Sequence, residues 1–208
     1  GQSFAIHSGW VAVSSALLVM VVFDPARKLL VNLTDHYLFQ KKEDVKVILN
    51  RLTSSIITIL DLEKVTAMIL KTFEESLRAE TGVILLKDEK GEAYEAVGVF
   101  GGNFQGQAYP VDHPLIRFFQ GQTGVFYLEI SEERNKVPEA VFQELGRFRA
   151  VISMPLVVQG ELLGMLFLGK KKSDQAYDAV ELSFFPVIAG QIAIALSNAR
   201  LYDTLKKS

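Results

Sequence analysis

Few residues of this sequence have the types and spacing that catalysis or metal binding requires. The 208 residues include three histidines and no cysteine, which excludes a disulfide framework, a thiolate zinc site and a cysteine nucleophile. The carboxylate pairs Glu43–Asp44 and Glu132–Glu133 have no histidine or nucleophile beside them in the sequence. We interpret both pairs as solvated faces. We therefore expect no catalytic residue, no metal site and no enzymatic activity from this chain.

A histidine and a glycine-rich loop are the other candidates for chemistry. His113 could be an axial haem ligand, because imidazole is a common donor, but within Asp112-His113-Pro114 it fits the start of a helix better. The loop at 101–109 (GGNFQGQAY) lacks the Lys-Ser/Thr pair that a phosphate-binding loop needs. We expect no cofactor.

A set of aromatic and thioether side chains could line an apolar pocket between a sheet and the loop and short helix that cover it. The candidates are Phe104, Tyr109, Phe118, Phe119, Met154 and Met165. The same side chains also suit ordinary core packing in a chain with 49% hydrophobic residues. A small-molecule pocket and a filled core therefore remain alternative interpretations.

Charge is distributed unevenly along the chain. The net charge of −2 gives no electrostatic basis for nucleic-acid binding. No Asp, Glu, Lys or Arg precedes Asp24, and fifteen of the twenty residues at 4–23 are apolar, a length that spans about 30 Å as a helix. Arg27 and Lys28 follow, which favours a cytoplasmic location for the remainder. Residues 1–23 are predicted to be the end of a transmembrane region, with a buried soluble helix as the alternative.

Residues 24–60 are predicted to form juxtamembrane helices. Val45, Leu52 and Ile59 are seven residues apart, the spacing of a short coiled-coil seam. The same pattern fits an amphipathic helix packed on the core of its own domain. The sequence does not decide between these two interpretations.

From residue 61 onward the period of the apolar residues alternates between that of helices and that of strands. Asp61 is a suitable N-cap for a helix that ends before Thr81-Gly82. Helices are also predicted at 114–119 and at 138–145, the second with Pro138 in its first position and Gly146 after its end. The predicted strands lie at 83–86, 94–100, 125–130, 151–158 and 162–169. The last two strands are joined so tightly that they must be antiparallel.

The final predicted helix begins at Asp178, with Glu181 completing a capping box. One of its apolar faces runs through Val187, Ile194 and Leu201, and a second face lies opposite. A helix that is apolar on two sides is buried on two sides, so one side should cover the sheet and the other should contact a partner chain or another helix. Pro186 interrupts the helix, at a cost of about 3 kcal/mol unless a kink absorbs it.

Several segments of the last third resemble a GAF domain. The runs SMPLVV at 153–158 and GELLGMLFLG at 160–169 look like its central hairpin, and YDAVEL at 177–182 followed by AGQIAIALSNARLY at 189–202 looks like its closing helix. With the opening helix from Asp61, the resemblance covers about residues 61–205. It implies an α/β fold of the α+β type, a central antiparallel sheet flanked by helices, here with an N-terminal helical extension. It also implies either small-ligand binding or conformational relay; the absence of cysteine argues against covalent bilin attachment, and the Asn-Lys-x-Phe-Asp-Glu motif of cyclic-nucleotide-binding members is missing.

The upstream segment is similar to the juxtamembrane linker of bacterial membrane-bound sensor histidine kinases. The similarity lies in the apolar segment, DPARK at 24–28 and DHYLFQKK at 35–42. It implies a GAF module at 61–208 on the cytoplasmic face of the inner membrane that forms a homodimer through its helices and relays a signal to a downstream output domain in the same chain. The alternative is a soluble small-molecule-binding GAF domain of a cyclase or a transcription activator.

Overall fold

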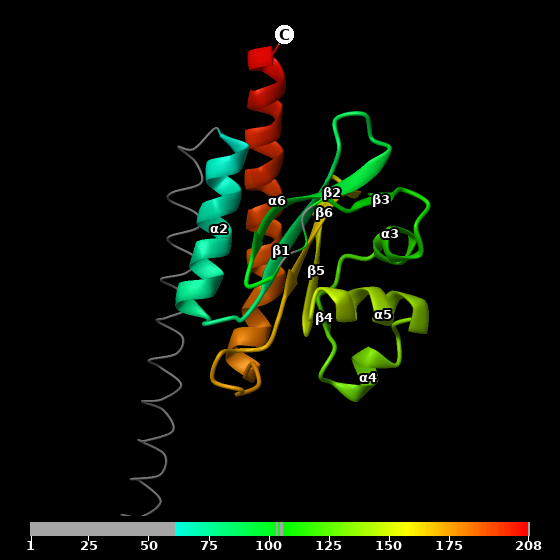
Figure 1. Ribbon diagram of the computed structural model, residues 1–208, viewed down its shortest axis with the longest axis vertical. Coiled ribbons are helices and arrows are strands. Elements are labelled where there is room, and N and C mark those ends of the chain that lie inside the picture. The colour runs from blue at the N-terminus through cyan, green and yellow to red at the C-terminus, as the bar shows by residue number, and fades with distance from the viewer. Residues whose placement is uncertain (1–60, 103, 105, 208) are drawn as a thin grey trace, which may run out of the picture. The chain divides into compact units, whose positions relative to one another are not determined.

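An antiparallel sheet with helices on both of its faces forms the centre of the described domain (Figure 1). The computed structural model describes residues 61–102, 104 and 106–207. The predicted membrane segment at 4–23, the segment at 24–60 and the seam residues Val45, Leu52 and Ile59 lie outside the described residues. The elements are α2 (Leu62–Ser76), β1 (Gly82–Lys87), β2 (Ala93–Phe100), β3 (Ala108–Pro110), α3 (Pro114–Phe119), β4 (Phe126–Tyr127), α4 (Ser131–Arg134), α5 (Glu139–Arg147), β5 (Ile152–Val158), β6 (Glu161–Leu168) and α6 (Ala179–Lys207).

The strand order is β3-β2-β1-β6-β5-β4, and every neighbouring pair is antiparallel. Helices α2 and α6 lie on one side of the sheet, and α3, α4 and α5 lie on the other (Figure 1). Successive strand residues point to opposite faces, so the central strands contribute to two cores. In β1, Ile84 packs with the α2 and α6 cluster, while Val83 and Leu85 pack with the cluster beneath α3 and α5. The predicted α+β fold is confirmed.

Helix α2 forms as the sequence predicts. The Asp61 side chain accepts a hydrogen bond of 3.1 Å from the Lys64 amide, which satisfies one of the free donors at the helix start. Its apolar stripe is fully buried against the sheet through Val65, Ile69 and Phe73. Gly98 of β2 permits this close approach, because a Cβ atom there would lie 2.3 Å from Cγ2 of Thr66.

Several predicted boundaries differ from the structure. The predicted strand at 125–130 is only Phe126–Tyr127, because the chain turns immediately afterwards and the Ile130 amide donates to the Tyr127 carbonyl. Pro138 is the N-cap of α5 and not its first helical residue, and Gly146 lies inside the helix. Strand β3 and helix α4 have no counterpart in the sequence prediction, because three- and four-residue elements are too short to show a period.

A buried ion pair fixes the first turn of α6. Nζ of Lys171 lies 2.7 and 2.6 Å from the two carboxylate oxygens of Glu181, and both side chains are only 9% exposed. The Asp178 amide also donates to Glu181, and the Asp178 side chain accepts from the Glu181 amide, so the predicted capping box is confirmed. The connection from β6 is therefore fastened to the helix start.

Pro186 lies one turn further along α6 and interrupts its hydrogen bonding. Proline has no amide hydrogen, so the carbonyl of Leu182, four residues earlier, loses its usual helical donor. The hydroxyl of Tyr127 donates to this carbonyl at 2.6 Å. A side chain of the edge strand β4 thus supplies the donor that the proline lacks.

Candidate functional site

Most of the aromatic and thioether residues predicted to line a pocket lie together beneath α3 and α5. Tyr109, Phe119 and Met165 are buried in this cluster, and Phe104 and Phe118 are half-buried against it. Met154 is wrongly placed by the sequence prediction, because it lies on the opposite face with α2 and α6. Met154 pairs with Leu166 across the β5–β6 hairpin, and residues directly opposite in a pair share a face.

Aromatic rings fill the space on this side of the sheet. Phe148 stacks on Phe167 with ring centres 4.8 Å apart, and Phe119 meets Phe167 at 6.0 Å. Tyr109 packs against Phe148 at 5.9 Å. These separations are those of packed aromatic cores, so Tyr109 and Phe119 pack against other rings of the core.

Two hydroxyl groups on this face are buried without a partner among the described residues. They belong to Tyr109, which is 1% exposed, and to Ser153 of β5, which is fully buried. Burial raises the pKa of Tyr109 to about 12, so its hydroxyl keeps its proton at neutral pH and can donate. The Tyr109 hydroxyl is therefore the polar group of the cluster best suited to contact a small molecule.

The Tyr109→Phe variant should be more stable than the parent chain by about 1 kcal/mol, because it removes a buried hydroxyl that has no hydrogen-bond partner. The matched control is Tyr94→Phe. The Tyr94 hydroxyl is equally buried but donates to the Leu162 carbonyl at 2.9 Å, so its loss should destabilise the chain by about 1 kcal/mol. Urea unfolding of both variants measures this difference in sign. Equal destabilisation by both substitutions would show that the Tyr109 hydroxyl is satisfied in solution.

His113 is the N-cap of α3. Its Nδ1 accepts a hydrogen bond of 3.3 Å from the Leu115 amide, and its ring lies edge-on to Tyr109 at 5.1 Å. Within the part of the chain that the structure describes, no group of three or more His, Asp or Glu side chains is arranged to hold a metal ion.

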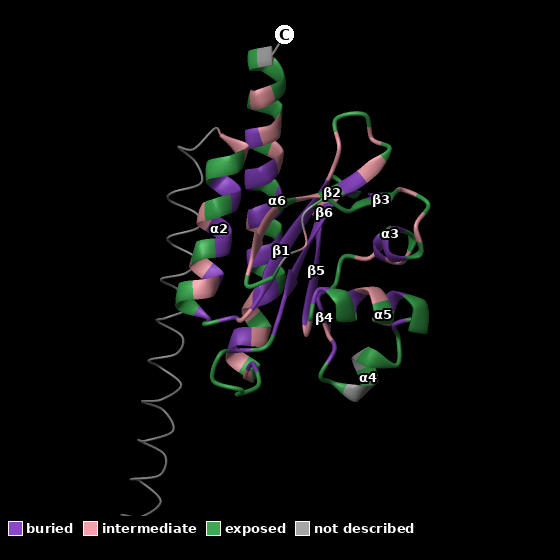
Figure 2. Ribbon diagram, in the orientation of Figure 1, coloured by how far each residue is buried: buried purple, intermediate pink, exposed green. Residues whose placement is uncertain are grey.

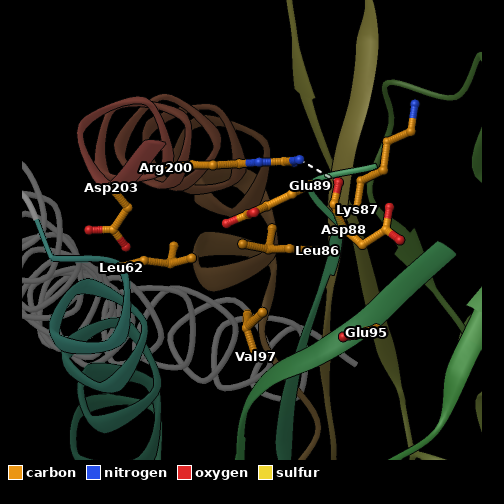
Figure 3. A pocket seen from close by; sticks show the side chains of 9 residues that line it. All are labelled: Leu62, Leu86, Lys87, Asp88, Glu89, Glu95, Val97, Arg200 and Asp203. Atoms are coloured by element: carbon orange, nitrogen blue, oxygen red, sulfur yellow. Dashed lines mark hydrogen bonds between the residues drawn. The ribbon is translucent and has the colours of Figure 1, made fainter. Parts of the chain in front are cut away.

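A second candidate site is a hollow of about 200 Å³ beside the C-terminal half of α6 (Figure 3). Leu62, Leu86 and Val97 supply its apolar lining, and its polar lining comes from Lys87, Asp88, Glu89, Glu95, Arg200 and Asp203. The Arg200 side chain extends from α6 and donates to the Asp88 carbonyl in the turn after β1 (Figure 3). Arg200 therefore fastens α6 to the β1–β2 hairpin.

Sequence reasoning did not identify this hollow, because its lining comes from α2, α6 and the β1–β2 hairpin, which only the fold brings together. Partial desolvation of Asp88 opposes ionisation, but hydrogen bonds from the amides of Glu92, Ala93 and Gly91 outweigh it and lower the pKa of this carboxyl group. The Asp88 carboxylate therefore stabilises the β1–β2 turn through these hydrogen bonds. The hollow has a lining of mixed charge.

The three predicted relay residues on α6 form an exposed apolar stripe. Val187 is 52% exposed, Ile194 51% and Leu201 62%, and Leu205 extends the stripe at 76%. The opposite side of the helix is buried against the sheet through Ile188, Ile192 and Leu196 (Figure 2). By length and composition alone, α6 is the one helix in the described part that could cross a membrane; its buried face accounts for much of this apolar character.

Comparisons with known proteins place this fold in context. A family model described as GAF domain matches residues 59–197. No curated protein matches the chain. Among solved structures, the GAF domain of a phosphoenolpyruvate-protein phosphotransferase from Coxiella burnetii is 20% identical, with a TM-score of 0.61 over 78% of this chain and 98% of that one. A methyl-accepting chemotaxis protein fragment is 18% identical, with a TM-score of 0.57 over 72% and 97% of the two chains. At such identities the likeness concerns the fold.

Proposed function

Because this chain belongs to the GAF domain family, we propose that it is the sensory or regulatory module of a membrane-bound two-component sensor histidine kinase. In this proposal, residues 4–23 anchor it and the domain lies on the cytoplasmic face of the bacterial inner membrane. It forms a homodimer through its flanking helices and passes a signal to a downstream output domain. Its role is regulatory and not catalytic.

The apolar stripe on α6 carries this proposal. Val187, Ile194 and Leu201 recur every seven residues and all face solvent, although the other side of the same helix is buried. Exposed apolar residues at this spacing form the contact surface of paired helices. The stripe also continues to Leu205, in the last turn of α6, so two paired helices would be in contact from Val187 to Leu205. A second copy of the chain is the occupant that this geometry favours.

Two solved structures that are similar to this chain agree with a signalling role. One is a methyl-accepting chemotaxis protein, and another is the phycoerythrobilin-bound GAF domain of a cyanobacterial phytochrome, 17% identical with a TM-score of 0.54 over 75% of this chain and 96% of that one. The present chain has no cysteine. If it has a ligand, the ligand is held without a thioether bond.

The Ile194→Glu variant should dimerise at least about 100-fold more weakly than the parent, because it places a charge at the centre of an apolar helix contact. Sedimentation velocity across a range of concentrations measures the shift from dimer to monomer. The control is Ala67→Glu, which adds the same charge at an exposed position of α2 away from the stripe. If both variants sediment like the parent, α6 is not the dimer contact.

The second candidate function is that of a soluble GAF domain that binds a small molecule. The observation that favours it is the buried Tyr109 hydroxyl, which has no partner among the described residues. In this case a ligand with a hydrogen-bond acceptor should purify with the chain and be lost from Tyr109→Phe. Native mass spectrometry of the two proteins measures it; parent preparations that never carry a ligand would exclude this candidate.

A further inference from the structure

We propose that strand β4 transmits changes in the aromatic cluster to α6, through the hydroxyl of Tyr127 on one side of the sheet and the ring of Phe126 on the other. Tyr127 is thus a coupling residue for the signalling helix. The inference rests on the proposed function in one respect only, namely that α6 carries the signal.

The first step is the contact between Tyr127 and the helix. Its hydroxyl donates to the Leu182 carbonyl at 2.6 Å, where Pro186 provides no amide hydrogen. Its ring centre lies 6.5 Å from that of Phe185. Without the hydroxyl, the Leu182 carbonyl would have to find another donor or open toward water, which would loosen the first turns of α6. The helix therefore depends at this point on a side chain from outside it.

The second step is the contact between Phe126 and the other core. Phe126 is 7% exposed, and its ring centre lies 5.2 Å from that of Phe118 and 5.7 Å from that of Phe119, both on α3. Adjacent residues of a strand point to opposite faces. Phe126 packs with the α3 and α5 cluster, whereas Tyr127 packs with the α6 cluster. A displacement of α3 that moves Phe126 therefore moves Tyr127 as well.

The third step is the light attachment of β4 to the sheet. It is an edge strand of two residues that pairs with Ser153 and Ile152 of β5 on one side, and the Leu128 amide that follows it donates to the Val151 carbonyl. The central strands β1 and β6 are each paired on both sides. An edge strand with so few ladder bonds shifts at a lower cost than a central strand. The Tyr127 hydrogen bond can then be either made or broken, which gives α6 two discrete states that packing around α3 selects.

The experiment is a double-substitution cycle measured by backbone hydrogen exchange on the full 208-residue chain. The Tyr127→Phe variant keeps the ring and removes only the hydroxyl. We expect exchange at residues 180–188 to rise about tenfold, with a change below about twofold at 196–204. The Phe126→Leu variant should raise exchange at 180–188 about fivefold when Tyr127 is present. In the Tyr127→Phe background, Phe126→Leu should cause no further rise in exchange, because the hydrogen bond that links β4 to α6 is already absent.

Tyr177→Phe is the matched control. The Tyr177 ring also contacts Phe185, at 5.7 Å, but its hydroxyl donates to the Gly169 carbonyl and not to the proline break. The effect of Phe126→Leu on residues 180–188 should therefore persist in the Tyr177→Phe background. The proposal would be overturned if Phe126→Leu and Tyr127→Phe had independent, multiplicative effects on the exchange rates at 180–188. It would also be overturned if Phe126→Leu left those rates unchanged.

A failure of this inference can be distinguished from a failure of the proposed function. The same cycle is repeated in the Ile194→Glu chain, in which the contact between α6 helices is disrupted. Coupling that persists there shows that the route lies within one chain. If the cycle shows coupling but the parent chain never dimerises, this inference is supported and the dimeric relay is excluded. A dimer without coupling retains the relay and excludes this route.

Discussion

Replacing Glu181 by Gln should lower the free energy of unfolding by about 3 kcal/mol, because it leaves the Lys171 ammonium buried without a countercharge. The carboxylate of Glu181 contacts Nζ of Lys171 with both oxygens and also accepts from the Asp178 amide. Both charged groups are almost completely shielded from water. Gln retains the length of the side chain and an oxygen that can accept from the Asp178 amide. The loss of stability therefore measures the effect of the charge alone. Thermal and urea unfolding measure it.

Glu74→Gln is the matched control for this substitution. Glu74 pairs with Lys172 at 3.0 Å, but both side chains are more than 40% exposed. Exposed pairs contribute at most about 1 kcal/mol, so this variant should be nearly as stable as the parent. The double variant Lys171→Met with Glu181→Leu should recover much of the loss, because it removes both buried charges together. Equal losses in Glu181→Gln and Glu74→Gln would show that the buried pair is solvated in solution.

Replacing Phe119 by Ala should cost about 3–5 kcal/mol. Its side chain is fully buried where α3 meets the sheet, and its ring contacts those of Phe118, Phe126 and Phe167. Removing the ring leaves a cavity between α3 and β6 that the neighbouring rings cannot fill without moving. Urea unfolding measures the loss, and a cavity of this kind should also take up a small apolar probe such as benzene.

Phe118→Ala is the control on the same helix. Phe118 is half-buried at the edge of the cluster, so its truncation removes less area from the core and should cost at most half as much. If the two variants are equally stable, the cluster is loosely packed and the alternative of a true ligand pocket gains support. Benzene that stabilises Phe119→Ala but not the parent would confirm that the parent cluster is filled.

The sequence predicted best the elements whose signals are local. The N-cap at Asp61, the capping box at Asp178 and Glu181, and the tight hairpin at Gln159-Gly160 each depend on residues within four positions of one another. The closing helix was also identified with both of its apolar faces. These features determine the order of the elements, whereas the fold was predicted from the resemblance of residues 61–205 to a GAF domain.

The positions that sequence could not predict depend on contacts between distant segments. Met154 was grouped with Met165, although the pairing of β5 with β6 places them on opposite faces. The hollow at Arg200 needs a hairpin and a helix separated by 112 positions in the chain. The donor that compensates for Pro186 is Tyr127, 55 positions away from its acceptor Leu182. Nothing in the local pattern around the proline indicates where such a donor lies.

Besides the Tyr127 hydrogen bond at Leu182, two side-chain contacts fasten helix α6 to the rest of the domain, Glu181 near its start and Arg200 near its end. About 28 Å of helix lies between them. Sliding of α6 along its axis would break both contacts together, whereas bending between them would break neither. The proline break at Pro186 lies within this interval. The mechanics of the domain therefore favour a bending motion of α6 over a piston motion.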